Sequence, residues 1–161
     1  MDNDGNLDIF TTDMLPFDPA ILLKSGGEDS DKVARIKATF GFNSQYARNH
    51  LQINKGNTTY VDVALMTRTY ATDWSWVVLL ADFDNDGNLD LFHVNGFGFV
   101  PGGDSFEFFE DPTRLFMSNG NGTFTEKALK LGLDDVGQGR GVVCFDFDRD
   151  GDVDLFIANN N

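Results

Sequence analysis

The feature that most constrains the fold of this chain is an acidic nine-residue pattern that recurs along it. The pattern D-x-D-x-D-G-x-x-D occupies residues 82–90 and returns, 64 residues later, at 146–154; a truncated copy lies at 2–8. The same offset holds without a gap from Leu51, which aligns with Leu115, to Asn95, which aligns with Asn159. A constant offset over so many positions indicates a structural repeat of about this length.

Each repeat predicts four antiparallel strands. Residues 50–64 and 114–128 are two strands about a glycine-containing turn. The apolar runs at 74–83 and 141–147 are expected to be inner strands buried on both faces, and a further strand follows each acidic loop. Four short strands per period of about 40–65 residues are typical of a β-propeller blade, whereas solenoid repeats are commonly shorter. The sequence therefore predicts an all-β fold.

The predicted domain organisation is a single propeller segment over residues 1–161. It divides into a partial repeat at 1–10, an insertion at 11–47, a repeat at 48–96, an insertion loop at 97–111 and a repeat at 112–161. The first insertion is expected to hold a short helix from about Asp31 to Thr39. About two complete four-stranded repeats plus a partial one cannot close a ring. We therefore expect either a fragment of a longer protein or a ring completed by further copies or partners.

The acidic loops predict calcium sites. Alternating carboxylates can converge on one point, the glycine lets the backbone turn back, and the seventh residue can offer its carbonyl oxygen. Ca²⁺ suits such an irregular all-oxygen site better than Mg²⁺, and Zn²⁺ would require His or Cys. An EF-hand is rejected because the twelfth positions are His93 and Ile157 and the flanks are strands. The alternative is an acidic turn without metal, which the repetition of the loop disfavours.

The predicted metal ligands fall into two complete sites and one incomplete site. The incomplete site lacks a first-position aspartate. The candidate ligands are Asp82, Asp84, Asp86, Asn88 and Asp90; Asp146, Asp148, Asp150, Asp152 and Asp154; and, in the incomplete copy, Asp2, Asp4, Asn6 and Asp8.

The charge balance limits the classes of partner. The chain has a formal net charge of −14 and an isoelectric point near 4.2. Nucleic acids and anionic membrane surfaces are disfavoured because both need clustered Lys and Arg. No apolar stretch is long enough for membrane insertion. An acidic protein of this kind suits cations, or simply high solubility.

Few other residues indicate a function. Trp74 and Trp76 alternate, which predicts that both face the core; a platform for carbohydrate stacking is the alternative. His50 and His93 lie in strand-like segments and are expected to be structural. The Phe-rich loop at 97–111 is expected either to contact a partner or to pack on a neighbouring blade. No catalytic constellation is present, so we expect no enzyme.

The repeats also resemble a known family. "LFMSNGNGTFTEKALKLGL" followed by "GVVCFDFDRDGDVDLFIANN" resembles an FG-GAP repeat, also called a VCBS repeat, and "ATDWSWVVLLADFDNDGNLDLFHVNG" is similar to the bacterial UnbV/ASPIC branch related to cartilage acidic protein. The resemblance implies a calcium-binding β-propeller like that of integrin α-subunits, exported to the periplasm, the cell surface or the extracellular space.

The function implied by this resemblance is protein or glycan interaction, in adhesion or scaffolding, with structural Ca²⁺. Two alternatives stay open at this point. One is a calcium-dependent polysaccharide lyase or hydrolase on a propeller scaffold. The other is a scaffold subunit whose ring is completed by a partner.

Overall fold

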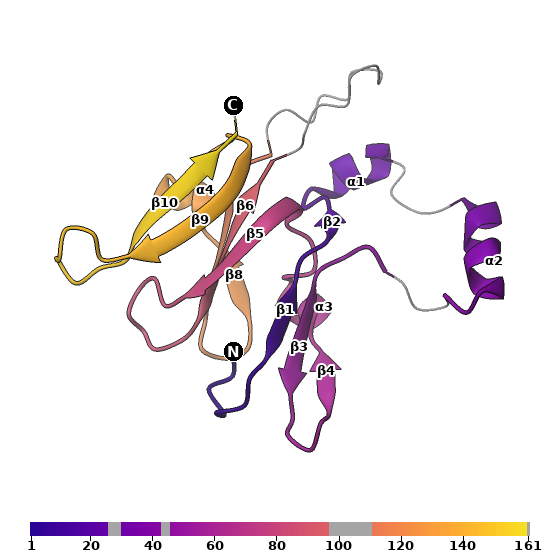
Figure 1. Cartoon of the computed structure of the whole chain (residues 1–161), viewed down its shortest axis with the longest axis horizontal. Helices are drawn as coiled ribbons and strands as arrows, with labels where there is room; N and C mark the ends of the chain where they lie inside the picture. The colour runs from indigo at the N-terminus through magenta and orange to yellow at the C-terminus, as the bar shows by residue number, and fades with distance from the viewer. Residues whose placement is uncertain (26–29, 43–45, 97–110, 161) are drawn as a thin grey trace.

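Three antiparallel sheets lie side by side in the computed structural model, which describes residues 1–25, 30–42, 46–96 and 111–160 (Figure 1). The first sheet has the order β1-β3-β4, the second β2-β5-β6-β7-β8, and the third β10-β9. The strands are β1 (Ile9–Thr11), β2 (Met14–Leu15), β3 (His50–Asn54), β4 (Tyr60–Asp62), β5 (Asp73–Ala81), β6 (Asp90–Asn95), β7 (Arg114–Ser118), β8 (Phe124–Glu126), β9 (Gly139–Phe145) and β10 (Asp154–Asn159). The predicted all-β, propeller-like fold is confirmed, and the three sheets do not close into a ring.

Four short helices connect these strands among the described residues. They are α1 (Pro19–Ser25), α2 (Asp31–Thr39), α3 (Ala64–Thr67) and α4 (Ala128–Leu131). The helix expected at 31–39 is confirmed. The two single-turn helices were not expected; they follow the hairpins β3–β4 and β7–β8 at the same repeat offset, and each ends at a residue in the left-handed conformation. None of the described helices is long and apolar enough to span a membrane.

The hydrogen-bonded sheets are out of phase with the sequence repeats. The repeat at 48–96 contains β3 to β6, and the repeat at 112–161 contains β7 to β10, as expected. However, β6 pairs with β7 of the following repeat, in the register Leu91 opposite Phe116 and Phe92 opposite Leu115. The four-stranded meander β5-β6-β7-β8 is therefore built half from one repeat and half from the next, with β2 added at its edge.

The core centres on β6 rather than on the strands that were expected to be inner. Every residue of β6 is buried, whereas β5 and β9 are mostly half-buried with exposed positions. The expectation that residues 74–83 and 141–147 are buried on both faces was therefore wrong. The reason is position. β6 has β5 on one side and β7 on the other, whereas β2 pairs only with Asp73 and Trp74 of β5, and β9 pairs only with β10. The apolar cluster around Phe92, Val94 and Leu115 is completed by side chains from β5, β9 and β10.

The acidic loops and the insertions leave the sheets at different strand ends. Each complete acidic loop follows the C-terminal end of a strand, β5 or β9, and enters the next. The insertions instead follow β1 and β6, so that they leave from the opposite end. In Figure 1 the β5–β6 and β9–β10 loops point to the left, while α1 and α2 lie at the upper right. The proposed subdivision at 97–111 falls largely on residues outside the described ranges.

Candidate metal centre

The three acidic loops share one backbone conformation. Their fourth positions have positive φ in all copies, and so do the glycines at their sixth positions. The φ values are 56° for Asn3, 56° for Asn85 and 65° for Arg149, and 85°, 86° and 96° for Gly5, Gly87 and Gly151. Values of φ near +90° are rare for a residue with a Cβ, which explains the glycine at the sixth position, whereas values near +60° are tolerated at the fourth position, most readily by asparagine. The truncated first copy is therefore folded like the other two.

The first-position aspartate closes each complete loop. Asp82 accepts hydrogen bonds from the backbone N–H groups of Asp86 (3.0 Å) and Gly87 (2.8 Å). In the third loop the equivalent bonds to Asp146 measure 3.1 and 3.2 Å. Because one carboxylate ties together the main chain four and five residues ahead, the loop conformation follows from its own aspartates.

Closing the loops brings carboxylates together. Asp82, Asp84 and Asp86 each place an oxygen within 4.8 Å of the others. In the third loop Asp146, Asp148 and Asp154 do the same. None of the ion pairs found between described residues involves an acid of these two loops. Several like charges gathered without a neutralising side chain, and offering only oxygen atoms, form a donor set that suits Ca²⁺.

The ninth-position aspartate also links two backbone segments, a role that the sequence pattern did not reveal. Asp90 is almost fully buried, with 1% of its surface exposed. It accepts hydrogen bonds from the backbone N–H groups of Phe83 (3.0 Å) and Ser118 (2.7 Å). It thus joins the start of the acidic loop to the end of β7. Asp8 repeats this arrangement, with the amino group of Met1 (2.6 Å) and the N–H of Asn54 (2.8 Å).

The remaining predicted ligands differ in their surroundings. Asp90 and Asp150 lie outside the two groups of three carboxylates that converge in the described residues. The side chains of Asn88 and Asp152 accept bonds from the neighbouring loops, donated by Asn3 (3.4 Å) and Asn85 (3.5 Å). Their backbone carbonyls stay the predicted ligands. The first loop therefore lies beside the second, and the second beside the third.

The first loop differs from the other two in its charges. Asp2 lies 3.3 Å from the ammonium group of Lys55, at a position where the next repeat has Asn119. Asp4 accepts two hydrogen bonds from Asn6, and these bonds hold the pKa of the Asp4 carboxyl below its usual value. A lysine therefore partly supplies the positive charge that the other loops lack.

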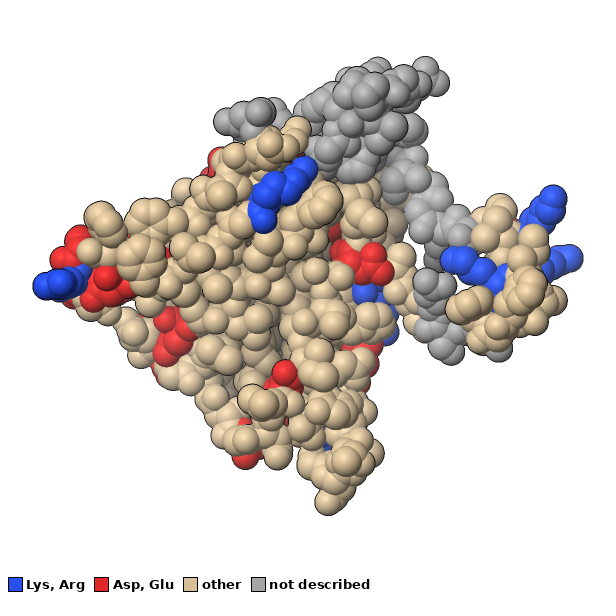
Figure 2. All heavy atoms as spheres, in the orientation of Figure 1, with Lys and Arg blue, Asp and Glu red and all other residues tan. Residues whose placement is uncertain are grey.

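The acids of the second loop act on one another electrostatically. Burial raises the pKa of the Asp90 carboxyl, and the charges of Asp84 and Asp86 raise it further, although its two backbone hydrogen bonds oppose the shift. The largest cause is burial, which disfavours the charged form, and repulsion from the neighbouring carboxylates adds to it. A divalent cation at this loop would reverse that repulsion. Figure 2 shows acidic side chains gathered along the left and lower edges, where these loops lie.

A second charged cluster, at the opposite end of the sheet, was missed by sequence reasoning. Asp73 forms an ion pair with Arg114 at 2.8 Å, and its other oxygen accepts a bond from the Phe17 N–H at 2.7 Å. The guanidinium of Arg114 also lies over the Phe17 ring, 4.3 Å from the centroid. Burial and the charge of Asp73 raise the pKa of the nearby Asp111 to about 7. No spacing pattern marks these residues, because sheet pairing alone brings them together.

The tryptophans and histidines have separate environments. Trp76 is 56% exposed, so the expectation that it packs in the core was wrong, whereas Trp74 is half-buried. His50 lies 2.7 Å from Asp62, which also pairs with Arg48. His93 is fully buried between Phe10 and Phe116, and burial lowers the pKa of its imidazole to about 3. Both histidines thus have structural surroundings.

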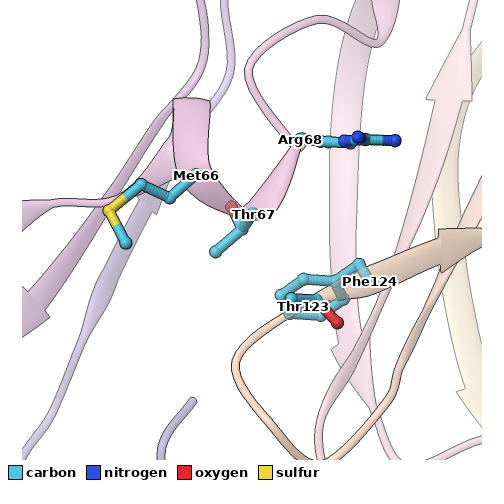
Figure 3. Close-up of a pocket in the computed structure, with 5 residues that line it drawn as sticks. All are labelled: Met66, Thr67, Arg68, Thr123 and Phe124. Carbon is cyan, nitrogen blue, oxygen red and sulfur yellow. The ribbon is translucent and has the colours of Figure 1, made fainter.

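A hollow of about 340 Å³ lies between α3 and the hairpin β7–β8 (Figure 3). It is lined by Met66, Thr67, Arg68, Thr123 and Phe124. This lining offers one cation and two hydroxyl groups but no carboxylate, imidazole or thiol. None of these lining residues belongs to an acidic loop.

Comparison with known proteins places the repeat in a family. Residues 104–157 match the family model described as an FG-GAP-like repeat. Cartilage acidic protein 1 from Mus musculus and from Xenopus tropicalis is 51% identical over 51 residues, and the human protein is 49% identical over the same length. Each match covers 31% of this chain and 8% of the relative, so the similarity is local.

Proposed function

We propose, from the premise that this chain carries an FG-GAP-like repeat, that it is a calcium-stabilised propeller segment acting as an extracellular interaction module. The observation that supports calcium most strongly is the convergence of three carboxylates within 4.8 Å in each of two loops of the same backbone form. The carboxylates have a structural role in this proposal, not a catalytic one. Asp82, Asp84 and Asp86 hold one ion, and Asp146, Asp148 and Asp154 hold the other, with the seventh-position carbonyls and Asp90 completing the sets.

Calcium would act by neutralising the loops. Two ions reduce the formal charge from −14 to −10, because each ion adds two positive charges. Extracellular calcium modules bind with dissociation constants of about 10⁻⁴ to 10⁻³ M. For a site of about 10⁻⁴ M, 5 mM Ca²⁺ stabilises the folded state by about 2 kcal/mol. Such sites fill at extracellular calcium concentrations, and local similarity to proteins named cartilage acidic protein 1 is consistent with that location.

The interaction role rests on surfaces that the described residues leave open. Phe145, Phe147 and Phe156 pack against one another on β9, β10 and their loop, but each is between 44% and 67% exposed. At the position of Phe156, the preceding repeat has Phe92, which is fully buried. We propose that another protein chain, either a second copy or a different partner, covers this face.

Thermal unfolding tests the calcium proposal. Chelator-treated protein should melt at a higher temperature in 5 mM CaCl₂ than in EGTA, and Asp84→Asn and Asp148→Asn should each remove part of this increase. Asp4→Asn, in the incomplete loop, is the matched control and should leave the increase unchanged. Equal melting temperatures with and without calcium would reject the proposal.

The solution mass tests the partner proposal separately. Sedimentation at micromolar protein should show self-association, or association with a partner, when calcium is present. A monomer of 17.9 kDa at all concentrations would exclude self-association.

A further inference from the structure

Two successive repeats place a β-bulge at the same position of an equivalent strand. On β5, Ser75 pairs with Asn95 and Val77 pairs with Val94, so that Trp76 is the extra, unpaired residue. On β9, Gly139 pairs with Asn159 and Gly141 pairs with Ala158, so that Arg140 is extra. Trp76 and Arg140 are separated by the repeat offset of 64 residues. Bulges re-aim side chains and are frequent next to functional sites.

The two bulge residues meet each other. The guanidinium carbon of Arg140 lies 4.3 Å from the centroid of the Trp76 ring, which is a close cation–π contact. Both side chains also donate to one carbonyl: the indole N–H of Trp76 lies 2.5 Å, and Nη1 of Arg140 lies 3.2 Å, from the oxygen of Gly96. A second bond from Nη1 reaches the carbonyl of Gly139 at 2.8 Å. The pair is therefore fixed in orientation before any ligand arrives.

Two glycines let the strands that carry the pair approach each other closely. A Cβ atom on Gly96 would lie 2.8 Å from Nη1 of Arg140 and 2.8 Å from the Cα of Gln138. Gly139 is still tighter, because its Cβ would lie 1.9 Å from Val94. The glycines thus allow β9 to approach β6 closely enough for Arg140 to reach across to Trp76.

Trp76 is also exposed to solvent, and Arg140 is half-buried. Trp76 exposes 56% of its surface although it is held by its indole hydrogen bond. The hydrogen bonds that Arg140 makes to other described residues all come from Nη1, so that Nη2 and Nε can donate elsewhere. A rigid, exposed indole beside a guanidinium with unused donors is an arrangement that suits ligand binding more than stability.

We infer that Trp76 and Arg140 form a binding platform for an acidic glycan, in which a sugar ring packs on the exposed surface of Trp76 and a uronate carboxylate accepts hydrogen bonds from Arg140. This inference rests on the proposed function as an interaction module and names its ligand class. A flat aromatic surface matches the apolar C–H face of a pyranose ring. A guanidinium matches the planar carboxylate of a uronate. A peptide fits less well, because peptides use grooves or regular sheet edges, and here a bulge interrupts the strand.

The carboxylates of the acidic loops do not prevent this. The acidic loop begins six residues beyond Trp76 along β5, which corresponds to about 20 Å of strand. That distance exceeds the screening length of about 8 Å at physiological ionic strength. The loop carboxylates therefore act only weakly on an anion bound at Arg140, and bound calcium would weaken their effect further.

The test is a calorimetric titration of the full chain in 1 mM CaCl₂. The probe is a hyaluronan hexasaccharide, in which glucuronate alternates with a neutral sugar, and chitohexaose is the neutral counterpart. We expect hyaluronan to bind at least tenfold more tightly than chitohexaose. Trp76→Ala should weaken hyaluronan binding at least tenfold, and Arg140→Gln at least fivefold with loss of the preference for the acidic sugar. Arg149→Gln removes the same charge from an acidic loop and should change nothing.

A second readout follows the wild-type protein and uses one conservative variant only to assign the signal. The chain has two tryptophans, so hyaluronan should shift one indole N–H signal in the NMR spectrum of the wild-type protein, and Trp74→Phe identifies it as that of Trp76. Hyaluronan binding that neither variant weakens, or a shift confined to Trp74, would overturn the inference. An absence of hyaluronan binding by protein that calcium stabilises would overturn it as well and leave the calcium proposal standing. Glycan binding by a protein that calcium does not stabilise would support this inference and reject the calcium proposal.

Discussion

Replacing Asp90 by alanine should destabilise the protein whether or not calcium is present. Asp90 is buried and accepts two backbone hydrogen bonds, from Phe83 and Ser118. Hydrogen bonds to a charged group contribute about 1.5–3 kcal/mol each, so that losing both costs about 3–6 kcal/mol. Burying an ionised carboxylate near Asp84 and Asp86 is itself unfavourable, which raises the pKa of Asp90. The net loss is therefore about 2–5 kcal/mol, a large part of the 5–15 kcal/mol typical of a domain.

The comparison with Asp84 makes this prediction specific. Asp84 is exposed and takes part in the group of converging carboxylates. Asp84→Ala should lower the free energy of unfolding by about 2 kcal/mol in 5 mM calcium, and should change it little in EGTA. In EGTA, the loss of stability in Asp154→Ala should lie between the losses in the other two variants, because Asp154 accepts a hydrogen bond from the Phe147 N–H but is less buried than Asp90.

Urea denaturation of the three variants in calcium and in EGTA provides the measurement. The reasoning requires Asp90→Ala to lose at least 2 kcal/mol in both conditions. If its loss disappears in EGTA, Asp90 acts only as a metal ligand and the bridging role assigned to it is wrong.

Three further predictions concern other parts of the fold. Asp111 has a pKa raised to about 7, so its contribution to stability is complete below about pH 4 and is lost as the pH rises through 7. The variant Asp111→Asn keeps an acceptor for the Trp74 N–H and should flatten the fall in the urea midpoint between pH 5 and 8. An unchanged slope of the midpoint against pH would contradict this. His93 has a pKa lowered to about 3, and its Nε2 lacks a hydrogen-bond partner among the described residues. The folded state therefore loses stability as the pH falls below about 6.5, the pKa of histidine in the unfolded chain, and this loss is about 2 kcal/mol at pH 5. His93→Leu should remove the loss, which denaturation at pH 5 and 7 would detect or exclude. Gly139→Ala should destabilise the protein strongly because the added Cβ would lie 1.9 Å from Val94, whereas Gly141→Ala should be tolerated because its Cβ would lie 3.8 Å from Ala158. Similar melting temperatures for the two variants would show that β9 does not pack on β6 as described.

The sequence was informative wherever a feature repeats. The repeat led to the correct strands, and the acidic pattern led to glycine turns and to two groups of carboxylates, of which three converge in each loop. Each of these features depends on residues close together in the chain. The helix at 31–39 followed from local composition for the same reason. Ligation by the individual residues stays a prediction.

Long-range pairing explains what the sequence did not reveal. The half-repeat shift of the sheets depends on whether β6 pairs with β7, and the burial of β6 depends on that pairing and on contacts from β9 and β10. Alternation placed Trp74 and Trp76 on one face, but the bulge at Trp76 changes its direction. Arg140 was not singled out at all. Its equivalence to Trp76 is visible in the repeat alignment, and that alignment was the signal that could have found it.

The measurement that tests the central claim most directly is the number of calcium ions bound per chain. Isothermal titration of chelator-treated protein should give two sites per chain, one of which is lost in Asp82→Asn and the other in Asp146→Asn, while Asp4→Asn retains both. The absence of calcium binding by the wild-type chain, or two sites persisting in the Asp82→Asn/Asp146→Asn double variant, would contradict the account.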